Sequence, residues 1–400
     1  MKNKHKIALF VSDTNPAGLL LVGRLLAEYI DRSKYHVIVV SCGPGPYGQI
    51  IGDYADEYHN LKTGSFPPLH KFKKGKHVID IFAGMKLFLW FIRSSWKLAF
   101  WLRANKIDLI HSHGDHFNLI AGISAKIVGT TSLWHIHNPQ VFPWSKGGTL
   151  LAQGYLGSFL ATHIVTVSAF EAGRYHHSWK NKVTVVPNGV DVQAISSGQH
   201  SGELRKLIQA REGERIVGII AILCARKGLP RFVEMAAKVL ESRSDVKFVI
   251  MGRILDELSE KIVSDLSLQA EALGIADKFC LVRDIDNASN FISDMDVFFM
   301  CSVPYTETFG LVVLEAMAAG VAVVSFANDA IPEIIEDNKN GFLVPDGDIA
   351  NASARILELL EDDGLAERIE KQAYKDVGEK FDISVFIDNI QKVYSKLLNE

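Results

Sequence analysis

Cysteine, charge of one sign and long apolar runs are all scarce in this chain of 400 residues. The net charge of -3 argues against a general nucleic-acid binder. No run of 18 uncharged apolar residues is present, which argues against a membrane-spanning helix, and the apolar run at residues 7–11 is too short for a signal sequence. Four cysteines are present, with no Cys-x-x-Cys pair and no zinc-ligand spacing, so we expect reduced core thiols and a cytoplasmic protein.

Short apolar runs do alternate with stretches of helical spacing along almost the whole chain. Runs that are apolar throughout are typical of strands buried on both faces of a parallel sheet. They are KIALFVS, YHVIVVS, DLIHSH, HIVTVS and VTVVP in the first half and RIVGIIAIL, VKFVIMG, KFCLV, DVFFMC and VAVVSF in the second. This alternation predicts doubly wound α/β units.

The alternation breaks once, in VVPNGVDVQAISSGQHSGELRK, where Gly, Ser and Asp follow a strand without any sustained period. We therefore predict two domains, residues 1–190 and 191–375, each of ordinary size. Residues 376–400 have helical spacing, and we predict a C-terminal helix that packs back on the first domain. Ligands of doubly wound folds bind at the carboxyl ends of the strands, so a cleft between two such domains is the expected site.

One carboxylate, Glu315, stands in the otherwise apolar helical stretch LVVLEAMAA. A buried carboxylate must be paired or neutral, so Glu315 has either a structural partner in the core or a ligand, such as the vicinal diol of a ribose. The backbone amides of Phe309, Gly310 and Leu311 precede this stretch and are placed to bind an anion at a helix N-terminus. With Glu307 in the loop before them, the set matches the ribose, diphosphate and hexose of a nucleotide sugar. The residues alone leave both interpretations open.

The segment YTETFGLVVLEAMAAGVAVVS resembles the Glu-x7-Glu signature of the retaining glycosyltransferases of family 4, which have the GT-B fold. PNGVD at residues 187–191 resembles the end of their N-terminal domain, and IPEIIEDNKNGFLVPDGD at residues 331–348 resembles the segment that follows the signature. The resemblance runs from residue 165 to 348 and is looser before that. It implies an α/β GT-B protein with two doubly wound, Rossmann-like parallel-sheet domains that face a central cleft.

The resemblance also implies roles for single residues. Glu307 would contact hydroxyls of the donor sugar and support the reacting centre, and Glu315 would hold the ribose. The amides of Phe309, Gly310 and Leu311 would hold the sugar or the distal phosphate.

The family supplies an Arg and a Lys to the diphosphate from a GRLxxxKG loop, and here the corresponding stretch is AILCARKG. Lys227 matches the Lys, but Ile222 occupies the place of the Arg. We expect Lys227 to bind the diphosphate and take part in catalysis, and Arg226 to substitute for the missing Arg from a different angle. The alternative is that Arg226 and Lys227 are only the solvated start of a helix.

Gly18, in SDTNPAGLLLVG, is the counterpart of a Gly-Gly pair that the family often has after its first strand. A tight turn there can approach the donor phosphate, although an ordinary strand-to-helix connection explains the same residues.

Two histidine pairs, in HSHGDHFN and WHIHNPQ, follow strands of the first domain. We expect only one histidine of each pair to face the cleft, and His113 and His137 are nearer the strand ends. By the resemblance, His113 would contact the donor sugar or the reacting centre, with Asp115 beside it, while His137 would line the acceptor side. Histidine and aspartate also bind metals, but GT-B enzymes characteristically bind no essential metal, so we expect none.

Residues 70–103 combine basic and aromatic side chains. Six of the eight residues from 70 to 77 are Lys or His, and a helical stretch rich in Phe, Leu and Trp follows. Such a helix either packs inside the domain or lies on an anionic membrane surface. The second interpretation implies a lipid-linked acceptor and a place at the inner face of the membrane.

These observations lead to one functional hypothesis: a retaining hexosyltransferase that moves sugar from a nucleotide-diphosphate donor to a glycan or lipid-linked acceptor, without a cofactor, in bacterial-type surface polysaccharide or glycoconjugate synthesis. One alternative is a sugar-nucleotide epimerase of the same fold. Another is a non-catalytic sugar-nucleotide-binding partner, which the Ile222 replacement favours.

Overall fold

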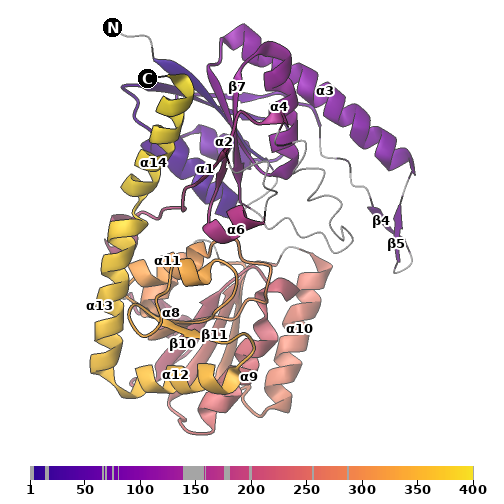
Figure 1. Ribbon diagram of the computed structural model, residues 1–400. Helices are drawn as coiled ribbons and strands as arrows, with labels where there is room; N and C mark the ends of the chain where they lie inside the picture. The colour runs from indigo at the N-terminus through magenta and orange to yellow at the C-terminus, as the bar shows by residue number, and fades with distance from the viewer. Residues whose placement is uncertain are drawn as a thin grey trace. The chain divides into compact units, whose positions relative to one another are not determined.

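The computed structural model describes residues 4–13, 18–64, 67, 70–73, 76–79, 81–137, 157, 159–174, 181–197, 201–254, 256–285 and 288–399 (Figure 1). It divides the chain into two units. Unit 1 comprises Met1–Pro187 and Phe386–Glu400, and unit 2 comprises Asn188–Val385.

Unit 1 is built on a seven-stranded sheet with the order β3-β2-β1-β6-β7-β8-β9. All neighbouring strands in it are parallel. The strands are β1 His5–Phe10, β2 Tyr35–Ser41, β3 Glu57–Asn60, β6 Leu109–His113, β7 Thr131–Ile136, β8 His163–Thr166 and β9 Val183–Val185. The strand order reverses between β1 and β6, and in doubly wound sheets this switch point is where ligands bind.

Helices cover the sheet of unit 1 and supply the other half of its core. They are α1 Gly18–Tyr29, α2 Tyr47–Gly52, α3 Ile81–Asn105, α4 Asp115–Val128, α6 Ala169–Gly173 and the end of α14 Ile383–Leu398. One cluster of buried side chains joins β1, β2 and β6 to α3 and α4, and it includes Phe10, Trp90 and Leu98. A separate antiparallel pair, β4 His70–Lys73 and β5 Lys76–Ile79, precedes α3.

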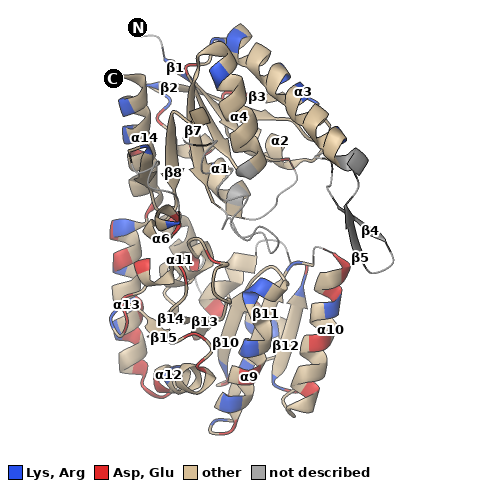
Figure 2. Cartoon of the chain, turned by 45° about the vertical axis from the view of Figure 1, so that its right-hand side comes forward, with Lys and Arg blue, Asp and Glu red and all other residues tan. Residues whose placement is uncertain are grey.

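Unit 2 has a six-stranded parallel sheet with the order β12-β11-β10-β13-β14-β15. Its strands are β10 Arg215–Ile220, β11 Val246–Gly252, β12 Phe279–Arg283, β13 Val297–Met300, β14 Ala322–Phe326 and β15 Phe342–Val344. Its helices are α7 Val192–Ser197, α8 Glu203–Leu207, α9 Leu229–Leu240, α10 Glu257–Ala272, α11 Leu311–Ala318, α12 Ile349–Glu361 and α13 Asp363–Lys380, with 3₁₀ turns η2 Ala225–Lys227, η3 Ala288–Asp294 and η4 Ile331–Glu333. Both signs of charge are spread along α10 and α13 (Figure 2), as expected of helices with a solvated face.

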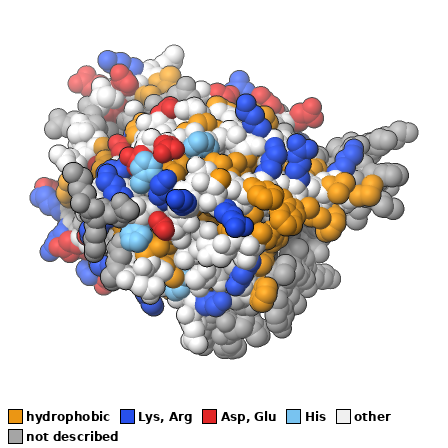
Figure 3. All heavy atoms as spheres, turned by 90° about the horizontal axis from the view of Figure 1, so that it is seen from above, with side chains coloured by type: hydrophobic (Ala, Val, Ile, Leu, Met, Phe, Trp, Pro, Cys, Tyr) orange, Lys and Arg blue, Asp and Glu red, His pale blue; other side chains and the backbone are white. Residues whose placement is uncertain are grey.

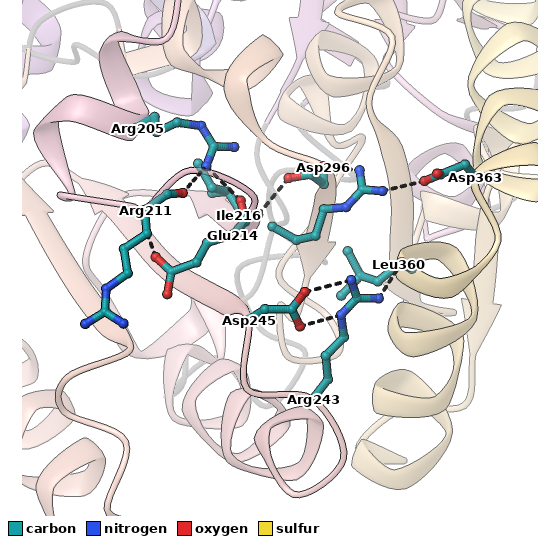
Figure 4. Close-up of polar contacts among 10 residues, drawn as sticks. Arg205, Arg211, Glu214, Ile216, Arg243, Asp245, Asp296, Leu360 and Asp363 are labelled. Carbon is teal, nitrogen blue, oxygen red and sulfur yellow. Dashed lines mark hydrogen bonds and ion pairs between the residues drawn. The ribbon is translucent and has the colours of Figure 1, made fainter.

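Ion pairs gather at the amino ends of the unit 2 strands (Figure 4). Arg215, the first residue of β10, pairs with Asp296 before β13 at 2.7 Å and also with Asp363 at the start of α13. Arg243 pairs with Asp245 at 2.7 Å and donates to the carbonyl of Leu360 in α12. These contacts tie the last helices to the sheet at the end opposite the loops that carry the candidate site.

The structure confirms the predicted fold class: both sheets are parallel, and the apolar runs form their strands. The division of the chain lies at residues 187/188, beside the boundary that we placed at 190/191. The predicted tail helix is interrupted, because α13 ends at Lys380 and α14 begins at Ile383. Between them the backbone pairs with Val190, which donates to the carbonyl of Phe381 at 3.0 Å and accepts from the amide of Ile383 at 2.9 Å.

Candidate functional site

Two loops of unit 2 meet at an ion pair that joins residues 80 positions apart. Nζ of Lys227 lies 2.6 Å from Oε2 of Glu307, and the two side chains are only 13% and 15% exposed. The hydroxyl of Ser302 donates to the same carboxylate oxygen at 3.4 Å. The structure therefore brings together two residues that the sequence singled out in separate motifs.

The turn after β10 places Lys227 against the end of β13. Gly228 follows the 3₁₀ turn with φ of 63°, and a Cβ atom there would lie 2.1 Å from the carbonyl oxygen of Cys301. Only glycine permits this close approach. The carbonyl of Arg226 accepts hydrogen bonds from the amide of Val303 at 3.0 Å and the hydroxyl of Thr306 at 3.2 Å. The loop that carries Lys227 is thus joined by hydrogen bonds to the loop that carries Glu307.

Asp329, which our sequence reasoning missed, holds the shape of this second loop. Its carboxylate accepts from the backbone amides of Tyr305, Thr306 and Glu307 at 2.7, 2.8 and 2.8 Å. Its own φ is 55°, a conformation that Asp tolerates better than most residues. An Asp in the loop that follows the buried strand β14 was the available signal.

The start of α11 has the geometry expected of an anion site. Gly310 has φ of 107°, and a Cβ atom there would lie 2.7 Å from Cδ1 of Ile331. The helix begins at Leu311. Within the part of unit 2 that the structure describes, the backbone amides of Phe309, Gly310 and Leu311 donate no hydrogen bond. Three adjacent donors are therefore available at the positive end of a helix.

Glu315 lies one turn further along α11, about 6 Å from Leu311 along the helix axis. Its side chain is half-buried, and no group among the described residues donates a hydrogen bond to it. Desolvation raises the pKa of its carboxyl group to about 7. The interpretation that Glu315 serves a structural partner in the core is therefore not supported by its surroundings.

Arg226 and Ile222 precede Lys227 in the sequence, and their side chains differ in exposure. The Arg226 side chain is exposed and forms no ion pair with a described residue, so its guanidinium is available to an anion. Ile222 is half-buried, as an apolar residue in place of the family's Arg would be.

The predicted histidines of unit 1 form one cluster at the ends of β6 and β7. We call His111, His113, His135 and His137 the histidine cluster. Nδ1 of His113 lies 2.9 Å from Nε2 of His137, and Nε2 of His111 lies 3.2 Å from Nδ1 of His135. Nδ1 of His111 also lies 2.7 Å from the hydroxyl of Tyr394 in α14. Our expectation that only one histidine of each pair faces the site was wrong, because residues two apart on a strand lie on the same face.

Burial keeps the histidine cluster neutral. Desolvation lowers the pKa of His113 to about 3, and it lowers the pKa values of His111, His135 and His137 well below the usual value for histidine. At neutral pH these imidazoles each carry one N–H and one lone pair.

The two remaining predicted site residues begin helices of unit 1. Gly18 is the first residue of α1 and is exposed. Asp115 is the first residue of α4, and its side chain lies outside the described residues. The structure thus gathers Lys227, Glu307 and the α11 amides in unit 2, and the histidines in unit 1.

Two family models match the chain and together span most of it. Residues 16–194 match the model described as "Glycosyltransferase Family 4", and residues 201–376 match "Glycosyl transferases group 1". The chain belongs to the glycosyltransferases of family 4. It is a transferase with two Rossmann-like parallel-sheet domains, as in GT-B proteins.

Curated relatives are similar at modest identity. The phosphatidyl-myo-inositol mannosyltransferase of Mycobacterium leprae is 29% identical over 66% of this chain and 74% of its own. A UDP-Gal:alpha-D-GlcNAc-diphosphoundecaprenol alpha-1,3-galactosyltransferase of Escherichia coli is 22% identical over 73% of this chain and 76% of its own. Among solved structures, Anabaena Alr3699/HepE in complex with UDP matches with a TM-score of 0.79 and 18% identity, covering 98% of this chain and 100% of that one. This last likeness shows a shared fold.

Proposed function

We propose that this protein is a retaining hexosyltransferase that uses a nucleotide-diphosphate sugar. The observation that carries the proposal is the carboxylate of Glu315, half-buried and without a described partner, one helical turn beyond three amides that are equally free. A carboxylate in such a place is stabilised by two hydroxyl donors, and a ribose supplies them as a pair.

The donor diphosphate then lies on the amides of Phe309, Gly310 and Leu311, within reach of Lys227. When the bond between the anomeric carbon and the phosphate oxygen breaks, negative charge grows on the leaving diphosphate. Preorganised amides and an ammonium group stabilise that charge in the transition state. This arrangement supplies cationic and N–H donors without a metal ion, so we expect none at the diphosphate.

Glu307 has a second role in this scheme. Its carboxylate pairs with Lys227 at 2.6 Å. We expect donor binding to draw Lys227 toward the phosphate and to leave Glu307 facing the hydroxyls of the sugar. Arg226, exposed on the adjacent turn, adds the second cation that Ile222 does not supply.

Two residues of unit 1 keep the roles that the family resemblance implies, as proposals. His113 would contact the donor sugar or the reacting centre, and His137 would line the acceptor side. Because both rings are neutral, they can accept or donate a hydrogen bond to hydroxyls without adding charge.

The proposed acceptor is a glycan or a lipid-linked molecule, and α3 favours the second. One side of this helix exposes large apolar side chains at helical spacing. These residues, which we call the apolar face of α3, are Met85, Phe88, Leu89, Ile92, Trp96 and Phe100. Phe88 and Phe100 are 64% and 67% exposed. An exposed hydrophobic patch with basic side chains beside it is visible in Figure 3.

Basic residues of α3 accompany this face: Lys86, Arg93 and Arg103 are all exposed. An apolar stripe with flanking cations is typical of helices that lie in the interface of an anionic bilayer. Among the described residues, no helix is long and apolar enough to cross a membrane. We therefore propose peripheral contact at the inner membrane face. The two relatives above support this choice, since both are named for acceptors that carry a lipid group.

The test begins with donor binding. Thermal unfolding is measured with UDP-, GDP- and ADP-sugars, and a bound donor at 100 times its Kd stabilises the protein by about 2.7 kcal/mol. We expect one nucleotide class to raise the Tm, and we expect Glu315→Gln to abolish the rise. The matched control is Glu358→Gln, an exposed carboxylate in α12, which should keep it.

Product analysis then separates the hypotheses. Transfer to a lipid-linked acceptor with an α-configured product from an α-configured donor supports the proposal. An epimerised nucleotide sugar formed without acceptor indicates the epimerase instead. Donor binding with no turnover on any acceptor indicates a non-catalytic partner, and no Tm rise with any nucleotide sugar overturns all three.

A further inference from the structure

Tyr305 lies in the loop that carries Glu307, and its backbone has a conformation that a large side chain disfavours. Its φ is 64°, in the left-handed region. Pro304 and Tyr305 form a turn, and glycine or asparagine is the usual residue at a turn position with positive φ. A bulky residue is uncommon there, because its Cβ atom crowds the following carbonyl oxygen. The loop therefore has a tyrosine at a position where glycine would be less strained.

Hydrogen bonds hold Tyr305 in this conformation. One carboxylate oxygen of Asp329 accepts from the amide of Tyr305 at 2.7 Å, and the other accepts from the amides of Thr306 and Glu307 at 2.8 Å each. The hydroxyl of Thr306 donates to the carbonyl of Val303 at 2.6 Å and closes the same turn. Strained residues persist only where surrounding contacts fix them, and they are frequent at ligand sites.

The fold gains little from the ring of Tyr305, which is 64% exposed. Within the part of the chain that the structure describes, its hydroxyl forms no hydrogen bond and its ring forms no aromatic or cation–π contact. Tyr35 and Tyr394 differ in both respects, because they are buried and their rings pack against each other with centroids 5.6 Å apart. Packing therefore does not explain the tyrosine at position 305.

We propose that Tyr305 binds the hexose of the nucleotide-sugar donor by stacking its ring on the apolar face of the sugar, an inference that rests on the proposed function. A pyranose presents C–H groups on a face and hydroxyl groups at its rim. The face of an aromatic ring is electron-rich and attracts C–H groups, whereas a carboxylate accepts hydrogen bonds from hydroxyl groups. Tyr305 and Glu307 thus contact two different parts of one sugar.

The order of groups along the chain favours the sugar over the nucleobase. We assigned Glu315 to the ribose and the amides before α11 to the diphosphate, so the base lies beyond Glu315 and the hexose lies at the other end of the donor. Tyr305 belongs to that other end, two residues before Glu307. The amides of Tyr305 and Glu307 bind the same carboxylate, so their backbones lie close together.

The experiment compares nucleotide sugars with the nucleoside diphosphates that they contain. UDP-glucose, UDP-galactose, GDP-mannose and ADP-glucose are titrated by calorimetry against the full-length protein, and so are UDP, GDP and ADP. For each nucleotide sugar that the wild type binds, we expect Tyr305→Ser to raise the Kd about five- to tenfold and to leave the Kd of the parent diphosphate unchanged. Tyr305→Phe keeps the ring and should bind both as the wild type does. The matched control is Tyr374→Ser, which removes a tyrosine that is 42% exposed in α13 and should change neither Kd.

Thermal unfolding tests the backbone strain separately from binding. Because glycine has no Cβ atom, Tyr305→Gly should have a higher Tm than Tyr305→Ala, which is the reverse of the order expected where φ is negative. Both variants should bind the nucleotide sugar as weakly as Tyr305→Ser. A Tm of Tyr305→Gly at or below that of Tyr305→Ala would overturn the proposal, because the tyrosine would then not be held under strain.

Two results of the titrations overturn the proposal and leave the proposed function intact. The first is an equal Kd of the nucleotide sugar for wild type and Tyr305→Ser, including the case in which only the KM for the acceptor rises. The second is an equal loss of affinity for the nucleotide sugar and for its parent diphosphate, which would place the ring on the nucleobase. A wild-type protein that binds none of these nucleotides contradicts the proposed function itself, and this inference with it.

Discussion

The two parallel sheets of this protein carry different functional groups at the carboxyl ends of their strands. At the carboxyl ends of the unit 2 strands lie an ion pair, backbone amides that donate to no described residue and a carboxylate with a pKa of about 7. At the carboxyl ends of β6 and β7 in unit 1 lie buried, neutral imidazoles. Both sheets are parallel and of similar construction, so the difference comes from a few side chains and not from the fold. We therefore propose that unit 2 binds the charged part of the donor and that the imidazoles of unit 1 contact uncharged hydroxyl groups.

Of the substitutions that test this comparison, removal of the Lys227 ammonium group should have the largest effect on activity. Lys227→Ala takes away a charge that we place on the leaving diphosphate, and we expect kcat to fall about 100- to 1,000-fold. Turnover with labelled donor measures it. Lys238→Ala is the control, because Lys238 forms a similar 2.6 Å pair with Glu241 on the exposed side of α9. Equal kcat values for the two variants would contradict the role of Lys227.

The proposed membrane contact of the apolar face of α3 can be tested by flotation with vesicles that contain anionic lipid. Phe88→Ser with Phe100→Ser removes the two most exposed rings of the apolar face of α3, and we expect the bound fraction to fall about tenfold. Leu258→Ser with Leu268→Ser, at exposed positions of α10 in unit 2, should leave binding unchanged. A wild-type protein that stays wholly with the soluble fraction would refute membrane contact.

The raised pKa of Glu315 makes the stability of the protein depend on pH. Because the folded-state pKa of about 7 lies above the model value of 4.5, the folded protein binds the proton more tightly than the unfolded chain. This contribution is complete below pH 4.5 and is lost as pH rises through 7. After allowance for partial exposure, we expect the free energy of unfolding of Glu315→Gln, relative to that of the wild type, to rise by about 1–2 kcal/mol from pH 5 to pH 8. Denaturant unfolding at both pH values measures it, and a pH-independent difference would show that Glu315 is not desolvated.

Asp329 should give the smallest effect, because it acts through the loop and not on the donor. Asp329→Gly keeps the backbone conformation available but frees the amides of residues 305–307. We expect kcat to fall several-fold, by about 1 kcal/mol, with KM for the donor rising. Asp337→Gly removes a carboxylate that accepts from the amide of Leu343, away from this loop, and should not change KM. An unchanged KM in both variants would show that the loop keeps its shape without Asp329.

Much of the architecture was predictable because buried parallel strands correspond to short, continuous runs of apolar residues. Apolar runs such as residues 322–326 are buried along their whole length, and a run of this kind has few alternatives to a buried strand. The sequence left two interpretations of Glu315 open, a structural partner in the core or a ligand, and among the described residues no group donates a hydrogen bond to its carboxylate.

Other features depend on contacts between residues far apart in sequence. The pairing of Lys227 with Glu307 spans 80 positions, and the three hydrogen bonds of Asp329 span more than 20. No local sequence pattern predicts such contacts. The histidine error had a different origin: strand geometry alone places His111 and His113 on one face, and we applied it wrongly.

The division of the chain between the two units, which falls within α14, has a practical consequence for the preparation of either unit alone. Unit 2 is one continuous stretch of chain, whereas unit 1 needs its last segment returned to it from the far end of the polypeptide. A fragment cut at residue 187 would lack Gln391, which accepts from the amide of Asp31, and Tyr394, which covers His111. The C-terminal half is therefore the piece to clone alone, and the N-terminal half should be made by grafting residues 386–400 onto it through a short linker.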